Sequence, residues 1–258
     1  MNATAADHPG TVLITGAAKR IGRAIALDLG TRGWRVAVHY RTSLEAAREV
    51  VAAIENRGGR ALAVDADLAN EAEAAALTGR AAKGLGPLTC LINNASIFEK
   101  DALASATAQG WDTHMAVNLR APMLLTKAFA AALPGATTGN VINLIDQRVL
   151  NQTPYFLSYT VSKAGLWALT RSTAMELAPA IRVNAIGPGP VLPSARQSGE
   201  DFARQRAATP LGRGPEPEEI CAAVRFILDA PSMTGQLIAL DGGQHLGWAT
   251  PEAGELPE

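Results

Sequence analysis

A tyrosine, a lysine and an aspartate near the middle of the chain have the types and spacing of a proton-transfer site. Tyr159 and Lys163 are four residues apart, which would place both side chains on one face of a helix. A phenol is a poor acid at neutral pH, and an adjacent ammonium lowers its pKa toward a useful range. Asp146 lies thirteen residues before Tyr159 and ends an apolar run typical of a buried parallel strand. We expect Asp146 beyond the carboxyl end of that strand, where open α/β sheets bind their ligands.

Short apolar runs alternate with longer helical patterns, which predicts a doubly wound parallel sheet with helices on both faces. Seven strands are expected, at Thr11–Thr15, Arg35–His39, Ala61–Asp65, Thr89–Ile92, Val141–Ile145, Ile181–Ile186 and Leu237–Leu240. Helices are expected at Arg20–Arg32, Ser43–Asn56, Glu71–Lys83, Trp111–Leu133, Ser158–Leu177 and Glu216–Ala230. The stretch Gly187–Gly214 is rich in Pro and Gly and reads as irregular, which is typical of a functional lid or a disordered segment.

Length and composition favour one α/β domain over residues 1–258, with ample apolar residues for a core. A formal net charge of −1 gives no electrostatic case for nucleic acid or an acidic membrane surface as partner. The chain has no signal-peptide pattern and no apolar window of membrane-spanning length, so we expect a soluble, cytoplasmic protein. Cys90 and Cys221 stand in apolar contexts and are expected to be buried free thiols. His114 and His245 lack partners at metal-ligand spacing, so no metal site is predicted.

The segment VLITGAAKRIGRAIAL predicts a strand, a glycine turn and a helix start that would bind a pyrophosphate. Gly16 would allow the tight turn, and Gly22 would allow close packing of helix on strand. The next expected strand runs into VHYRTS, which has no acidic residue where an NAD-preferring site usually holds the ribose 2′-hydroxyl. Arg41 can grip a 2′-phosphate through its forked guanidinium, which favours NADPH. Alternatively, Ser43 caps the next helix and Arg41 only faces water.

Taken together, these motifs resemble the short-chain dehydrogenase/reductase family, from about Val12 to Leu246. Most of that family has a serine where this chain has Asp146. This departure, with Arg20 at the middle glycine of the TGxxxGxG turn, resembles the pteridine reductase and dihydromonapterin reductase subgroup. The resemblance implies a single-domain Rossmann-type fold, NADPH as coenzyme, a small-molecule pterin as substrate, a homotetramer, and a substrate loop at about 188–214.

The resemblance also assigns roles to individual residues. Asn118 matches an asparagine that holds a water chain to the lysine, although a helix-interior asparagine bonded to backbone is an alternative. Phe98 would stack on the pterin, or else close over the core as a loop hydrophobe. Arg20 would reach both phosphate and pterin, or else be an ordinary solvated arginine.

The complete set of expected contacts has three parts. The coenzyme contacts are Gly16, Arg20, Ile21, His39, Tyr40, Arg41, Thr42, Ser43, Asp67, Leu68, Asn94, Ala95, Ser96, Tyr159, Lys163, Pro188, Gly189 and Val191. The substrate contacts are Arg20, Ser96, Phe98, Asp146, Tyr159 and Leu192, and the catalytic residues are Asp146, Tyr159, Lys163 and Asn118.

The carboxylate of Asp146 changes the expected reaction, because it cannot donate a hydrogen bond to the alkoxide that forms in ketone reduction. Protonation of a C=N bond develops positive charge, which a carboxylate stabilises; a carboxyl whose pKa is raised by burial can instead relay a proton. The sequence therefore favours an NADPH-dependent reductase of dihydropterins: dihydromonapterin, dihydrobiopterin or dihydrofolate. Two alternatives stay open, a carbonyl reductase of 3-oxoacyl thioesters, sugars or alcohols, and a non-catalytic NADPH-binding protein in which Asp146 caps a turn.

Overall fold

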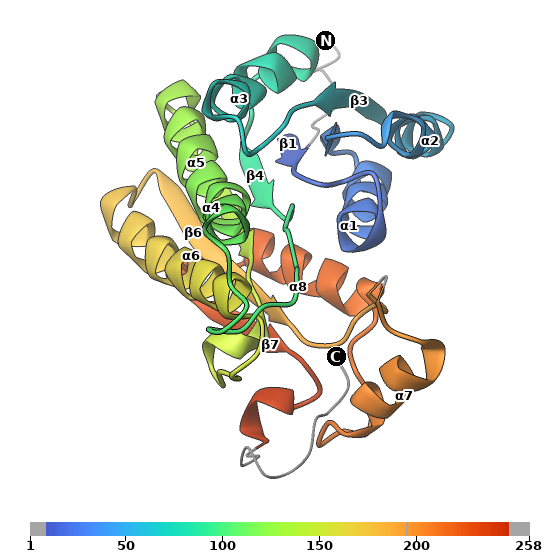
Figure 1. The fold of residues 1–258 in the computed structure, drawn as a ribbon. Coiled ribbons are helices and arrows are strands. Elements are labelled where there is room, and N and C mark those ends of the chain that lie inside the picture. The colour runs from blue at the N-terminus through green and yellow to red at the C-terminus, as the bar shows by residue number, and fades with distance from the viewer. Residues whose placement is uncertain (1–8, 195, 248–258) are drawn as a thin grey trace, which may run out of the picture.

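A seven-stranded sheet in the order β3-β2-β1-β4-β5-β6-β7 forms the centre of the computed structural model, which describes residues 9–194 and 196–247 (Figure 1). All neighbouring strands pair in parallel. The strands are β1 (Thr11–Ile14), β2 (Arg35–Tyr40), β3 (Arg60–Asp65), β4 (Cys90–Asn93), β5 (Gly139–Leu144), β6 (Ile181–Pro188) and β7 (Leu237–Leu240). The α-helices are α1 (Arg20–Thr31), α2 (Leu44–Glu55), α3 (Glu71–Leu85), α4 (Ala108–Met115), α5 (Ala121–Ala132), α6 (Leu157–Glu176), α7 (Gly199–Ala207) and α8 (Pro217–Asp229). Shorter elements are η1 (Ala116–Arg120), η2 (Gln147–Val149) and η3 (Gln244–Leu246).

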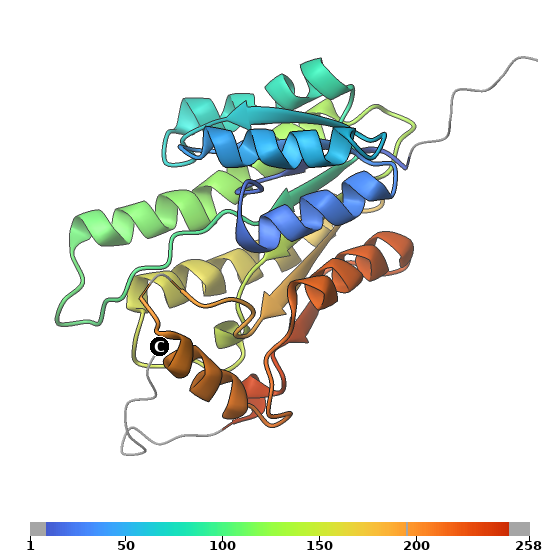
Figure 2. The same ribbon diagram turned by 90° about the vertical axis from the view of Figure 1, so that its right-hand side faces the viewer.

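Helices cover both faces of the sheet, because alternate residues of each strand point to opposite sides (Figures 1 and 2). Val12 and Ile14 of β1 pack in the core under α1, α2 and α8. Leu13, between them, packs in the second core with α3, α5 and the end of α6. The predicted Rossmann-type, doubly wound fold is confirmed.

The strand order reverses at β1. β2 and β3 lie on one side of β1, and β4 pairs with β1 on the other side. The loops after β1 and β4 therefore diverge, and they open a crevice at the carboxyl edge of the sheet. The loops after β5 and β6 join the same edge, so residues far apart in sequence meet there.

The helix expected at Trp111–Leu133 is interrupted. α4 and α5 are joined by η1, a π-helical turn from Ala116 to Arg120 that contains Asn118. Such turns insert an extra residue into a helix and are frequent at functional sites. The hydrophobic pattern alone does not distinguish a π turn from a regular helix.

The expectation of an irregular stretch at Gly187–Gly214 was wrong in part. β6 continues to Pro188, and α7 lies inside the stretch. The Ser198 side chain accepts a hydrogen bond from the Asp201 backbone N–H and caps α7. No residue of α7 is buried, so the helix lacks the apolar stripe on which the sequence reading relied. Its capping serine and acidic first turn were the available signal.

The prediction made for the two cysteines is confirmed. Cys90 and Cys221 are buried free thiols, as expected, and burial raises the pKa of Cys221 to about 12.

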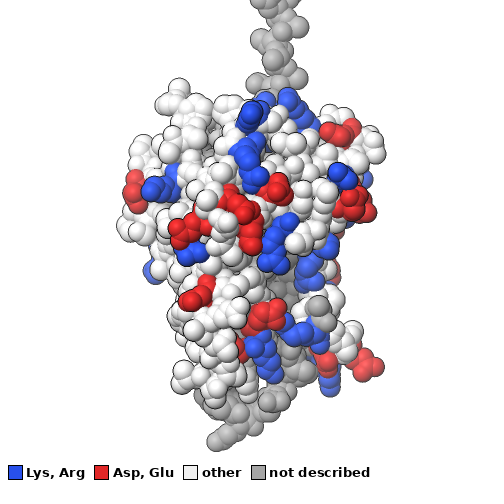
Figure 3. All heavy atoms as spheres, turned by 45° about the horizontal axis from the view of Figure 1, so that its top comes forward, with Lys and Arg blue, Asp and Glu red and all other residues white. Residues whose placement is uncertain are grey.

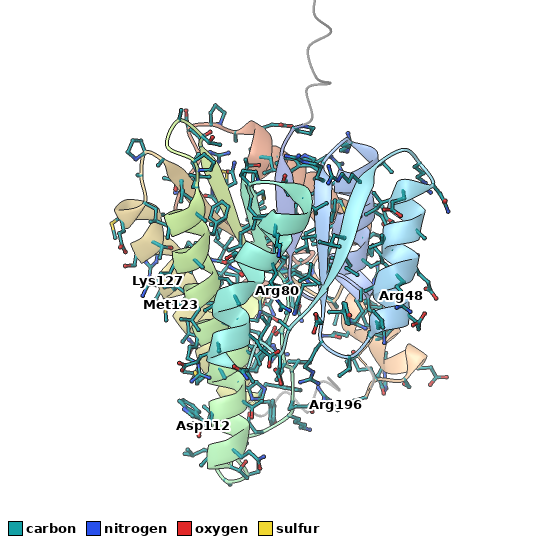
Figure 4. The ribbon with its side chains drawn as sticks, turned by 90° about the horizontal axis from the view of Figure 1, so that it is seen from above. Arg48, Arg80, Asp112, Met123, Lys127 and Arg196 are labelled. Carbon is teal, nitrogen blue, oxygen red and sulfur yellow. The ribbon has the colours of Figure 1, made fainter. Side chains whose placement is uncertain are left out.

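Within residues 9–194 and 196–247, no helix has the length and apolarity needed to cross a membrane. Figure 3 shows basic and acidic side chains interspersed over one face. Figure 4 shows Arg48 on α2 and Met123 on α5 at opposite edges of the molecule.

Candidate active site

A cavity of about 550 Å³ opens at the carboxyl edge of the sheet. Its walls come from the loops after β1, β2, β3, β4, β5 and β6. Every residue expected to contact coenzyme or substrate lines this cavity. Asn118, expected as a catalytic residue, does not line it. Further lining residues that were not expected from the sequence include Gln147, Arg148, Gln197, Phe202, Gln205 and Gln244.

The Tyr159 hydroxyl donates a hydrogen bond to Asp146 Oδ2 over 2.8 Å. Tyr159 lies in the first turns of α6, and Asp146 lies two residues beyond the end of β5. The other carboxylate oxygen, Oδ1, accepts from the backbone N–H of Arg148 at 2.9 Å and so caps η2. One carboxylate thus fixes a turn and holds the phenol, which makes capping and proton-transfer roles compatible.

Lys163 lies one helical turn beyond Tyr159 and is buried. Its Nζ donates to the carbonyl of Leu144 at 2.8 Å and lies 5.7 Å from the centroid of the Tyr159 ring. Burial lowers the pKa of Lys163 to about 8, and the negative charge of Asp146 opposes that shift. At neutral pH the ammonium form predominates, so a positive charge stands near the Tyr159 ring.

Asn118 is fully buried and bonds the loop after β4. Its Oδ1 accepts from the backbone N–H of Ile97 at 2.8 Å, and its Nδ2 donates to the Ile97 carbonyl at 2.9 Å and to Ser162 Oγ at 3.0 Å. The backbone-bonded alternative therefore describes these contacts. Asn118 joins the loop that carries Phe98 to the helix that carries Tyr159.

His39 supports the glycine turn from behind. Gly16 adopts a left-handed φ of +64°, and its backbone N–H donates to His39 Nδ1 at 2.9 Å. His39 Nε2 lies 3.2 Å from the carbonyl of Ala66 and serves as the donor there. Burial lowers the pKa of His39 to about 4, so the ring is neutral at pH 7, which suits one donor and one acceptor nitrogen.

The loop after β2 places Arg41 and Thr42 at the exposed edge of the cavity. Ser43 stands at the N-cap of α2, yet its side chain makes no capping hydrogen bond. The alternative in which Ser43 caps the helix is thus not observed. The edge keeps a guanidinium and two hydroxyl groups available for a phosphate.

Arg20 joins the glycine turn to the loop after β6. Its guanidinium donates to the carbonyls of Pro193, at 2.7 Å, and Leu192, at 3.1 Å. Its backbone has a φ of +56°, a left-handed conformation that is uncommon for a residue with a side chain. Arg20 is therefore more than an ordinary solvated arginine, because its side chain bonds two carbonyls of the expected substrate loop.

Phe98 stacks on another phenylalanine at the substrate end of the cavity. Its ring lies 4.4 Å from that of Phe156, with an interplanar angle of 8°, and 4.6 Å from the Tyr159 ring in an edge-on arrangement. Phe156 is buried and has a left-handed φ of +60° at the start of α6. The sequence reading missed Phe156, and only its position three residues before Tyr159 could have indicated it.

The comparisons with known proteins agree with this architecture. A family model described as Enoyl-(Acyl carrier protein) reductase matches residues 16–245. The chain belongs to the short-chain dehydrogenase/reductase family.

Its relatives include reductases of different substrates. The structure of FolM Alternative dihydrofolate reductase 1 from Brucella canis, complexed with NADP, is 47% identical, covers 94% of this chain and 96% of that chain, and has a TM-score of 0.91. A 3-oxoacyl-[acyl-carrier-protein] reductase of Synechocystis sp. is 33% identical and covers 90% of this chain and 95% of the relative. The angucycline C-6 ketoreductase LanV, with bound NADP, is 34% identical, covers 93% of this chain and 97% of that chain, and has a TM-score of 0.86. The NADP in these structures agrees with the coenzyme that the sequence predicts.

Proposed function

We propose that this protein is an NADPH-dependent reductase of dihydropterins, which it converts to tetrahydropterins by reducing a C=N bond. The observation that carries the proposal is the 2.8 Å hydrogen bond from the Tyr159 hydroxyl to Asp146 Oδ2. It joins the expected proton donor to a carboxylate at the position where most of the family has a serine. A carboxylate suits a reaction that develops positive charge on a ring nitrogen.

The residues of the cavity fit NADPH. A Cβ on Gly22 would lie 2.4 Å from the Gly16 carbonyl oxygen, so the helix start and the glycine turn pack too closely for a side chain. The start of α1 offers backbone N–H groups to a pyrophosphate. Arg41, with Thr42 and Ser43 beside it, would hold the 2′-phosphate. When bound, NADPH supplies the hydride.

The chain's own residues would manage the proton and the charge. Tyr159 donates a proton to the substrate nitrogen, for which the fixed ammonium of Lys163 makes the phenol a better acid. Asp146 orients the hydroxyl and stabilises the positive charge on the substrate. Phe98 and Arg20 both line the cavity and would contact the pterin ring.

The relatives give this proposal partial support. FolM Alternative dihydrofolate reductase 1 fits it, at 47% identity over most of both chains. The homotetramer and the cytoplasmic location that the family resemblance implies stay predictions.

A carbonyl reductase is the second candidate, because several relatives at 32–33% identity are 3-oxoacyl-[acyl-carrier-protein] reductases. Against it stands Asp146, which is an acceptor when ionised and cannot donate to a forming alkoxide. The two candidates share the coenzyme, the fold and the Tyr159–Lys163 pair. They differ in what the residue at position 146 must do.

A parallel assay tests the proposal. Purified protein is mixed with NADPH, and NADPH oxidation is followed with dihydrobiopterin, dihydromonapterin, dihydrofolate and an acetoacetyl thioester. We expect turnover on at least one dihydropterin and none on the thioester. Turnover on the thioester alone would support the carbonyl reductase, and NADPH binding without turnover would support the non-catalytic alternative.

A further inference from the structure

Arg148 is a buried cation in the wall of the cavity that the proposed mechanism leaves unused. Its side chain is 5% exposed, and its Nη1 donates to Thr153 Oγ1 at 2.9 Å. Its Nε lies 3.9 Å from Asp146 Oδ1, the same oxygen that accepts from its backbone N–H. A buried guanidinium is unfavourable unless its charge is compensated. The carboxylate that holds the Tyr159 hydroxyl is one group that supplies negative charge beside this guanidinium.

The same guanidinium contacts the aromatic pair next to the phenol. Its carbon lies 5.1 Å from the Phe156 ring centroid and 5.9 Å from that of Phe98, within the range of cation–π attraction. Phe98 in turn packs against Tyr159. Arg148 therefore touches both the hydrogen-bond acceptor of the phenol and the rings that support it.

The two oxygens of Asp146 have separate tasks. Oδ1 faces the backbone N–H and guanidinium of Arg148, and Oδ2 accepts from Tyr159. From α6, Tyr159 bonds this carboxylate, and the negative charge of Asp146 acts on the nearby Lys163.

We propose that Arg148 is a positioning residue that holds the Asp146 carboxylate with Oδ2 directed at Tyr159. Asp146 then acts as a fixed negative charge that orients the phenol, and the proton comes from Tyr159 alone. The inference rests on the proposed function and deepens it. It also chooses between the two roles, charge stabilisation and proton relay, that the sequence left open for Asp146.

Two substitutions of Arg148 and one control test the inference. Arg148→Met removes the charge and keeps the length, Arg148→Lys keeps the charge, and Arg225→Met breaks an ion pair with Asp28 between α8 and α1. With a dihydropterin, we expect kcat of Arg148→Met to fall roughly tenfold to a hundredfold, a part of the usual contribution of a general acid. Arg148→Lys should restore part of the rate, and Arg225→Met should match the wild type.

A loss of stability alone would not be relieved by restoring the charge, so Arg148→Lys separates positioning from folding. If kcat of Arg148→Met stays within twofold of the wild type, or Arg148→Lys restores none of the lost rate, the inference is wrong. If the wild-type protein reduces the thioester and no dihydropterin, the proposed function fails, and the same variants are compared with the thioester.

A substrate-free titration gives a second readout. The absorbance of the Tyr159 phenolate is followed against pH, with the matching Tyr159→Phe variant as blank. We expect the midpoint to rise in Arg148→Met, which lacks the neighbouring cation, and to stay in place in Arg225→Met. An unchanged midpoint in Arg148→Met would overturn the inference whatever the substrate.

Discussion

The two ends of the cavity are built in different ways. At the coenzyme end, backbone groups and neutral side chains hold the glycine turn: His39 accepts from Gly16, and the Asn94 Nδ2 donates to the Thr15 carbonyl at 2.8 Å. At the substrate end, charged and aromatic side chains hold one another, as Asp146 does with Tyr159. The first arrangement suits a coenzyme that several of the relatives bind. The second suits chemistry that differs among its members.

Among these substitutions, Tyr159→Phe should lower the reaction rate most. It should remove the proton donor at the substrate end and leave the coenzyme end unchanged. The ring contact with Phe98 remains, whereas the proton donor is lost. We expect kcat with a dihydropterin to fall roughly 10²–10⁴-fold, the range typical of a general acid, with little change in melting temperature. A rate within tenfold of the wild type would mean that another group supplies the proton.

Arg41→Ala should affect only the coenzyme end. Loss of a charge-assisted contact to the 2′-phosphate should weaken the binding of NADPH by about 1–3 kcal/mol and leave the binding of NADH nearly unchanged. The measurement is the Michaelis constant for each coenzyme, with Arg48→Ala as the control. Arg48 is exposed and pairs with Glu45 on the surface of α2. Equal effects of Arg41→Ala on both coenzymes would remove the role assigned to Arg41.

His39→Gln should change the pH dependence of stability and give the smallest effect. The pKa of His39 is lowered from 6.5 to about 4 in the folded protein, so between these values the unfolded state binds the proton and the folded state does not. Stability should therefore fall as the pH falls, by up to roughly 2 kcal/mol between pH 7 and 5. Urea unfolding at both pH values should show this loss in the wild type and not in His39→Gln. The same loss in both proteins would contradict the assigned cause.

Much of the coenzyme end could be predicted from sequence because short local motifs mark many of its residues. The glycine turn, the strand before it and the loop after β2 lie in one stretch, and short motifs describe them. His39 was expected to touch the coenzyme, and the structure adds a supporting contact to Gly16 from behind the turn. Burial decides that role, and the local sequence does not specify it.

The substrate end could be predicted only in part. Asp146, Tyr159 and Lys163 were found because their spacing follows a strand and a helix. Phe156 and Arg148 were missed, since their importance depends on contacts with Phe98, which lies on a different loop. α7 was missed because its residues are not buried and no periodic apolar pattern marks it.

The exchange Asp146→Ser tests the central claim most directly, with the dihydropterins and the acetoacetyl thioester assayed in parallel. We predict that this variant loses most of its kcat on the dihydropterin that the wild type prefers, with NADPH binding retained. Any activity gained should be on the thioester, since a serine can donate to a forming alkoxide. An unchanged dihydropterin rate in Asp146→Ser would contradict the account, because the carboxylate beside Tyr159 would then play no part in choosing the reaction.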